Sequence, residues 1–287
     1  MIPAPFDYER AESVEHAIQL LGQHGEDAKL IAGGHSLLPL MRLRLARPSV
    51  LIDIDRISGL DEIGATRSGV RIGALARIHD VATNETVRSA CPILAEAAGK
   101  VGDPQVRHRA TIGGTVAHGD PAGDLPAVLL ALDANFSVQG PNGERSIPAG
   151  EFFRSVFETA LAPDEVLTEI RVNTVSGTGR GRGAYLKFNR RAIDWAIVGV
   201  AALVDQDDGH IREASVALVN MGLTPIRATA VEAALAGGGT DPASLAAAAE
   251  HAPDGTSPPS DTNGSAEYRR ELSKVLVRRA LEEALSR

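Results

Sequence analysis

The chain is poor in the residues on which several kinds of site depend. It has one cysteine, Cys91, which excludes an internal disulfide and falls short of the four cysteines that hold an iron–sulfur cluster. Aromatic residues make up 3% of the sequence, so platforms for stacking nucleic-acid bases are scarce. Lys and Arg number 29 against 37 Asp and Glu, a net charge of −8, whereas nucleic-acid binding favours a basic face. We therefore expect no nucleic-acid partner and no cluster in this chain, and a buried, unreactive Cys91.

Long hydrophobic runs are also absent. The longest, Trp195–Val204, is about half the length of a membrane-spanning helix. The first residues, Met1–Arg10, lack the basic segment followed by an apolar stretch that marks a signal peptide. The sequence thus predicts a cytoplasmic protein without a membrane span, with peripheral membrane contact through partners left open. Its 287 residues, 44% of them hydrophobic, suffice for about two globular domains.

Hydrophobic periodicity predicts mixed helices and strands in the first two thirds of the chain. Ser13 is placed to cap a helix whose apolar positions run from Val14 to Leu21 and which Gly22 or Gly25 can end. Further helices are expected over 37–45, over 78–99 with a break near Cys91-Pro92, and over 124–132. Expected strands, two of them joined by a hairpin turn at 141–143, are Ala28–Ala32, Val50–Ile54, Val70–Ala74, Asn135–Val138, Arg145–Pro148 and Val166–Val172.

The last third of the chain has a different texture. Asn173–Gly183 is rich in Gly, Ser and Thr and is the predicted linker. Strands followed by helices then predict an α+β domain with its helices on one face of a sheet. The expected strands are Tyr185–Phe188, Ala196–Val204 and Ala214–Val219, and the expected helices are Arg227–Leu235, Ser244–Glu250 and Ser265–Leu285.

Two short loops carry the strongest sign of chemistry. Ala32-Gly33-Gly34-His35-Ser36 and Thr111-Ile112-Gly113-Gly114-Thr115 both place two glycines before a terminal hydroxyl, next to apolar segments. Glycine permits positive φ and close approach of a ligand, successive N–H groups form an anion nest, and the hydroxyl can cap a helix that starts just after. Either loop alone is as consistent with a plain turn. The pair predicts a diphosphate site whose ligand the spacing does not name.

Other motifs of nucleotide binding and catalysis are missing. The sequence has no Walker A motif, no G-x-S-x-G elbow and no G-x-G-x-x-G fingerprint, because Gly177–Gly183 has the wrong spacing. His118, Asp120 and Asp124 are residue types that bind metals, but a turn at Asp120 and a helix cap or ligand contact at Asp124 is the simpler interpretation. We expect neither a metal nor a catalytic acid–base residue in this chain.

Many separated segments resemble, in order, the FAD-binding medium subunit of the molybdenum hydroxylases, the xanthine dehydrogenase family. The matching segments span essentially the whole chain and are residues 5–8 (PFDY), 25–28 (GEDA), 32–43 (AGGHSLLPLMRL), 51–55, 105–107, 111–121 (TIGGTVAHGDP), 123–126, 187–191 and 266–269 (AEYR). The resemblance implies an α+β protein with the PCMH-type FAD-binding fold of vanillyl-alcohol oxidase over 1–176. That fold has two α/β subdomains, at about 1–57 and 58–176, and a C-terminal α+β domain would follow over 177–287.

The resemblance also implies which residues bind FAD. The two loops, extended by one leucine, would hold the pyrophosphate through Ala32, Gly33, Gly34, His35, Ser36, Leu37, Thr111, Ile112, Gly113, Gly114 and Thr115. Asp124 would lie by the adenosine part, and Leu167 would contribute from the strand before the linker. Lys187 would sit near the isoalloxazine edge, where a positive charge stabilises reduced flavin. Trp195 stands where relatives often pack Phe or Tyr on the flavin ring, with a core tryptophan as the alternative.

His35 points to one branch of the family. Members commonly have Gln at this position, whereas the aerobic carbon monoxide dehydrogenase branch has His, as this chain does. In berberine-bridge-type oxidases a similar Gly-Gly-His bonds covalently to flavin, but those chains carry a large substrate domain that this one lacks. We therefore expect non-covalent FAD. His108 and Ala110 stand where Asn and Gly are usual, so the residues leading into the second loop are expected to differ slightly.

The activity that the resemblance implies is electron relay within a larger oxidoreductase. A large molybdenum subunit would oxidise carbon monoxide, and a small subunit would carry two [2Fe–2S] clusters, so that both metal cofactors belong to partners only. FAD in this chain would pass the electrons to a quinone or similar acceptor, in a dimer of heterotrimers. Two alternatives stay open: a flavin subunit for xanthine, nicotine, an aldehyde or an aromatic acyl-CoA, and a non-catalytic nucleotide-binding or assembly protein.

Overall fold

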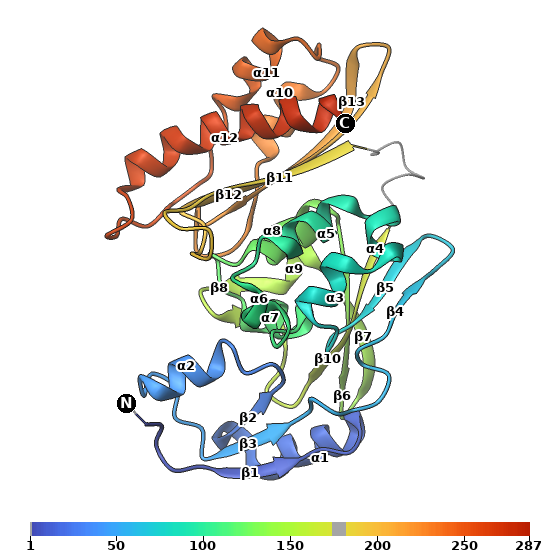
Figure 1. Cartoon of the computed structure of the whole chain (residues 1–287), viewed down its shortest axis with the longest axis vertical. Helices are drawn as coiled ribbons and strands as arrows, with labels where there is room; N and C mark the ends of the chain where they lie inside the picture. The colour runs from blue at the N-terminus through green and yellow to red at the C-terminus, as the bar shows by residue number, and fades with distance from the viewer. Residues whose placement is uncertain (1, 174–181) are drawn as a thin grey trace.

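The computed structural model describes residues 2–173 and 182–287, which form three lobes stacked along the long axis of the molecule (Figure 1). The predicted domain boundary at 176/177 and residues 174–181 of the predicted linker lie outside the described residues. Within the two described ranges, no helix is both long and apolar enough to cross a membrane.

The first lobe is built on a three-stranded parallel sheet. Its strands have the order β1 (Asp7–Arg10), β3 (Val50–Asp53) and β2 (Ala28–Ile31). Its helical segments are α1 (Val14–His24), the 3-10 turn η1 (Gly25–Asp27) and α2 (Leu37–Arg42). Ser13 caps α1 as predicted, since its Oγ accepts the N–H of His16 at 3.1 Å. Helix α2 is shorter than predicted, and Arg44 just beyond it has a φ of 61°.

The middle lobe has a five-stranded antiparallel sheet packed against helices. The strand order is β4 (Ile63–Ala65), β5 (Gly69–Gly73), β10 (Val166–Asn173), β6 (Asn135–Gly140) and β7 (Gly143–Pro148). The predicted hairpin is confirmed, with Gly140 opposite Gly143. The other elements are α3 (Ile78–Thr83), α4 (Glu85–Ala90), α5 (Pro92–Gly99), α6 (Pro104–Arg107), α7 (Ile112–His118), α8 (Asp124–Ala131), α9 (Ala149–Phe152), β8 (Phe153–Ser155) and β9 (Glu158–Thr159).

The segment 78–99 forms three helices where two were predicted. The break at Cys91-Pro92 is present, and a second break falls at Asn84. Asn84 has an extended backbone, and its Oδ1 accepts the N–H groups of Thr86 and Val87 at 2.9 and 3.3 Å. An asparagine that caps in this way ends one helix and starts the next.

The third lobe is a four-stranded antiparallel sheet with helices on one face. The strands are β11 (Arg182–Phe188), β12 (Val198–Asp207), β13 (His210–Val219) and β14 (Ile226–Arg227), and the helices are α10 (Thr229–Leu235), α11 (Pro242–Ala249) and α12 (Ala266–Ser286). Side chains alternate along β12: Val200 and Ala202 join the core under these helices, whereas Ala201 and Leu203 join the core of the middle lobe. The opposite face of the sheet therefore lies on α5 and α8 (Figure 1).

Candidate functional site

The first glycine loop turns the chain from β2 into α2. Gly34 has a φ of +74°, which only glycine adopts at low cost. The Nδ1 atom of His35 lies 3.0 Å from the carbonyl oxygen of Gly33, and the imidazole is exposed. Ser36 occupies the N-cap position of α2 but makes no capping hydrogen bond through its side chain, so the expected cap is wrong at this loop.

The second glycine loop is the first turn of α7 rather than a turn before a helix. Thr111 is the N-cap, and its Oγ1 accepts the N–H of Gly114 at 3.1 Å. Thr115 lies inside the helix and donates its hydroxyl to the Thr111 carbonyl at 3.2 Å, so the capping hydroxyl is the first residue of the motif and not the last. Neither glycine of this loop has a positive φ, contrary to expectation. Gly113 is required by packing instead, because a Cβ there would lie 2.5 Å from Ala74.

The two loops lie directly against each other. A Cβ on Gly33 would be 2.1 Å from the carbonyl oxygen of Arg109 and 2.8 Å from Cα of Ala110, the residues that lead into the second loop. Only glycine therefore fits at position 33. Because the loops come from different lobes, this contact brings the starts of α2 and α7 together, with Gly114 exposed at the second.

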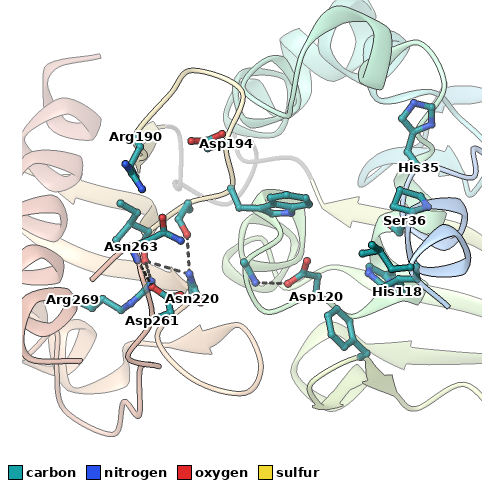
Figure 2. A pocket seen from close by; sticks show the side chains of 18 residues that line it. His35, Ser36, His118, Asp120, Arg190, Asp194, Asn220, Asp261, Asn263 and Arg269 are labelled. Carbon is teal, nitrogen blue, oxygen red and sulfur yellow. Dashed lines mark hydrogen bonds and ion pairs between the residues drawn. The ribbon is translucent and has the colours of Figure 1, made fainter. Parts of the chain in front are cut away.

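A cavity of about 630 Å³ opens beside the first loop and is lined by residues of all three lobes. Figure 2 shows His35, Ser36 and His118 on one side and Arg190, Asn220, Asn263 and Arg269 on the other. Trp195 also lines this cavity and is 69% exposed, which argues against the alternative of a core tryptophan. His118, at the end of α7, stacks on Phe157 with ring centroids 4.8 Å apart, and burial lowers the pKa of His118.

The loop that carries Trp195 is anchored from two distant elements. The Nδ2 atom of Asn220, after β13, donates to the Ala196 carbonyl at 2.8 Å. Arg269, in the first turn of α12, is fully buried and donates to the Ile197 carbonyl, while it pairs with Asp261 at 2.8 Å. Sequence reasoning missed both anchors, although Arg269 ends one of the segments that matched the family.

Asp124 and Lys187 form a buried ion pair away from this cavity. Lys187 Nζ lies 3.0 Å from Asp124 Oδ2, and each side chain is 5% exposed. The hydroxyl of Tyr185, which is fully buried, donates to Asp124 Oδ1 at 2.5 Å. Burial raises the pKa of Asp124, against the lowering effects of Lys187 and Tyr185. Sequence reasoning missed Tyr185.

Lys187 lines a second cavity, of about 430 Å³, together with Lys100 and Arg107. Leu167 is 5% exposed on β10 beside a bulge in its pairing with β6, and it lines neither cavity. The structure thus brings the first loop, the end of α7 and Trp195 together at the first cavity. It places Lys187 at the second cavity instead, with Asp124 as its ion-pair partner. Among the described residues, no group of three His, Cys, Asp or Glu is placed to hold a metal ion.

Comparison with known families decides the assignment. Residues 4–173 match the FAD binding domain in molybdopterin dehydrogenase, and residues 183–284 match the CO dehydrogenase flavoprotein C-terminal domain. The chain belongs to the FAD-binding subunits of the molybdopterin dehydrogenases. It is therefore an FAD-binding subunit of an oxidoreductase, and its fold class is the predicted one.

Two relatives match this FAD-binding subunit equally well over its whole length. The carbon monoxide dehydrogenase medium chain of Hydrogenophaga pseudoflava is 42% identical over 100% of this chain and 99% of its own. The 6-hydroxypseudooxynicotine dehydrogenase complex subunit alpha of Paenarthrobacter nicotinovorans is also 42% identical, over 100% and 97%. The solved structure of the H. pseudoflava carbon monoxide dehydrogenase lacking the Mo-pyranopterin moiety superposes with a TM-score of 0.97 at 44% identity, covering 100% and 99% of the chains.

The residues of this FAD-binding subunit fit the cofactor. The two loops pack so closely that a side chain at position 33 would not fit between them. Gly114 is exposed in the first turn of α7. The N–H groups of Ile112, Gly113, Gly114 and Thr115 already donate to Ala76, Ala74 and Thr111, so the second loop offers the cofactor an exposed backbone surface and not free N–H groups. The Nε of Arg269 has no hydrogen-bond partner although it is buried beside the first cavity, so a polar donor remains at the wall opposite the first loop.

Proposed function

We propose that this chain is the FAD-binding medium subunit of an aerobic, molybdenum-containing carbon monoxide dehydrogenase. The observation that carries the proposal is the full-length similarity, in sequence and in structure, to the carbon monoxide dehydrogenase of H. pseudoflava. His35 supports the same branch, because it is the residue that the resemblance to the carbon monoxide dehydrogenase branch implies at this position.

Of the proposed binding residues, His35, Ser36 and Trp195 line the first cavity and Lys187 lines the second. The loops Ala32–Leu37 and Thr111–Thr115 would hold the pyrophosphate, and Trp195 would cover the isoalloxazine. Asp124 and Leu167 of the middle lobe and Lys187 of the third would complete the site. The FAD-binding domain would end at residue 176 and the C-terminal domain begin at residue 177. When bound non-covalently here, FAD would supply a relay between one-electron clusters and a two-electron acceptor. The chain's own part is to hold, orient and tune that group.

The proposed partners follow from the same similarity. A large subunit would hold the molybdenum cofactor and a small subunit two [2Fe–2S] clusters, in a cytoplasmic dimer of heterotrimers with a quinone or similar acceptor. A tag on this chain should therefore recover two further subunits with molybdenum and iron, and the complex should reduce a dye when supplied with CO. Reduction by the isolated chain with CO would contradict this division of labour.

A second candidate is the flavin subunit of a dehydrogenase for a hydroxylated N-heterocyclic compound. The relative from P. nicotinovorans, as similar as the carbon monoxide dehydrogenase chain, favours it. The purified complex should be offered both substrates. Dye reduction with 6-hydroxypseudooxynicotine and none with CO would replace the first proposal by the second.

The loop assignment has a test of its own in the assembled enzyme. Gly34→Val adds strain at a φ of +74° and a branched side chain to the first loop, and Gly114→Val places a Cβ 2.7 Å from Thr111 Oγ1. Both should abolish FAD retention, measured as flavin absorbance per protein. Gly59→Val is the matched control, because Gly59 has a φ of +82° with open space around it. Full flavin content in both loop variants would defeat the assignment.

A further inference from the structure

Arg77 connects the two lobes that carry the glycine loops. It lies just before α3 in the middle lobe, where its Nη2 donates to Asp55 Oδ1 at 2.6 Å. Asp55 follows β3, the strand that pairs with β2 and so shares a sheet with the first loop. The side chains of Arg77 and Asp55 are 23% and 18% exposed, so this ion pair is largely shielded from water.

The second terminal nitrogen of the Arg77 guanidinium binds the backbone just before the second loop. Arg77 Nη1 donates to the Arg109 carbonyl at 2.6 Å. The backbone of Arg77 also forms an isolated antiparallel β-bridge with Thr111. The N–H of the next residue, Ile78, donates to the Ala110 carbonyl at 3.0 Å. Arg77 is thus tied to the second loop through both its side chain and its main chain.

The carbonyl that Arg77 holds is the one against which the first loop packs. A Cβ on Gly33 would lie 2.1 Å from the Arg109 oxygen, so the backbone of Gly33 already touches this atom. One guanidinium therefore fixes the contact point of the two loops from the second lobe and, through Asp55, from the sheet of the first.

We propose that Arg77 and Asp55 form a clamp that sets the spacing of the two glycine loops, and thereby how tightly they grip the FAD pyrophosphate. The clamp is a positioning device, because neither Arg77 nor Asp55 lines either cavity. The inference rests on the assignment of the two loops to the pyrophosphate. Two loops on separate lobes can contact one diphosphate together only if the lobes are held in register, and hydrogen bonds weaken steeply when their geometry is lost. A clamp formed before binding also lowers the ordering cost of binding.

The test measures the rate at which FAD leaves the assembled enzyme, followed by the fluorescence of released FAD. Arg77→Ala and Asp55→Asn should each release FAD about 10- to 100-fold faster, the effect of losing one or two charge-assisted hydrogen bonds. Arg77→Lys keeps the charge for Asp55 but not the second donor, so its rate should fall between. The reduction potential of the FAD that stays bound should remain at the wild-type value, because the clamp acts on the pyrophosphate end.

The matched control is Arg71→Ala. Arg71 also joins two carboxylates, Glu62 at 3.1 Å and Glu169 at 3.3 Å, but all three lie in the middle lobe, on β5, just before β4 and on β10. This variant should release FAD at the wild-type rate. Equal rates for Arg77→Ala and wild type, or equal acceleration by Arg77→Ala and Arg71→Ala, would overturn the clamp. Retention of FAD in Gly34→Val and Gly114→Val would instead overturn the loop assignment on which it rests.

Discussion

Replacing Lys187 with methionine should destabilise the chain strongly at neutral and alkaline pH. The ammonium and the Asp124 carboxylate lie 3.0 Å apart with both side chains 5% exposed. Removing one member of such a buried pair leaves an uncompensated charge, which costs about 3–5 kcal/mol of unfolding free energy. Tyr185 offsets part of this cost, because its hydroxyl still donates to Asp124.

The loss should shrink as the pH falls. Burial already raises the pKa of Asp124, and Lys187 opposes that rise, so the pKa rises further when Lys187 is absent. A carboxyl with a pKa above its unfolded value favours the folded state once it is protonated. Lys187→Met should therefore approach the wild-type stability as the pH falls through the raised pKa of Asp124.

Urea unfolding of the chain at pH 8 and pH 5, followed by circular dichroism, measures both effects. The double variant Asp124→Asn with Lys187→Met should recover part of the loss, because it leaves no buried charge. Lys274→Met is the control: Lys274 also pairs with two carboxylates, Glu250 and Glu271, but these are exposed, so stability should stay close to wild type. A loss below about 1 kcal/mol, or one that does not change with pH, would refute the buried-charge reasoning.

Three further outcomes are expected. Gly33→Ala should lower flavin content because its Cβ would lie 2.1 Å from the Arg109 oxygen, whereas Gly22→Ala, with open space on helix α1, should raise stability by up to about 1 kcal/mol. Burial lowers the pKa of His118, so the folded state disfavours its protonation. His118→Phe should therefore reduce the loss of stability on acidification below about pH 6.5. Thermal midpoints at two pH values measure this, and an unchanged pH dependence would count against it. In the assembled enzyme, the fluorescence of Trp195 is the difference in emission between the wild type and Trp195→Phe. This difference should increase when FAD is removed, and an unchanged difference would contradict stacking on the flavin.

Much of the local structure was predictable because its causes are local. Ser13 starts a helix through its own hydroxyl, and the turn at 141–143 joins two strands of matching pattern. The break at Asn84 was missed, although an asparagine before a short helix is a capping signal. The capping hydroxyl of the second loop was placed at Thr115 when it is Thr111, because a motif shows residue types without showing where the helix begins.

The site divides in the same way. The residues of the two glycine loops were recognisable from their pattern, but the reason for each glycine was not. Gly34 adopts a positive φ as expected, whereas Gly33 and Gly113 are required by backbone packing against Arg109 and Ala74. No pattern in the neighbourhood of Gly33 reveals that residue 109 lies against it.

The sequence by itself determined the class of this protein: an acidic chain with one cysteine and two glycine loops has the groups to hold a dinucleotide and too few thiols to hold a cluster. Only the tertiary structure decided how those groups meet. It placed Trp195 and His35 in the wall of one cavity, and it buried Asp124 between Lys187 and the Tyr185 hydroxyl. It also brought Arg77 into contact with both Asp55 and the Arg109 carbonyl. The physical reason is range. Turns, caps and periodicity act over a few residues, whereas burial and charge pairing depend on how three lobes pack, and side chains far apart in the chain make those contacts.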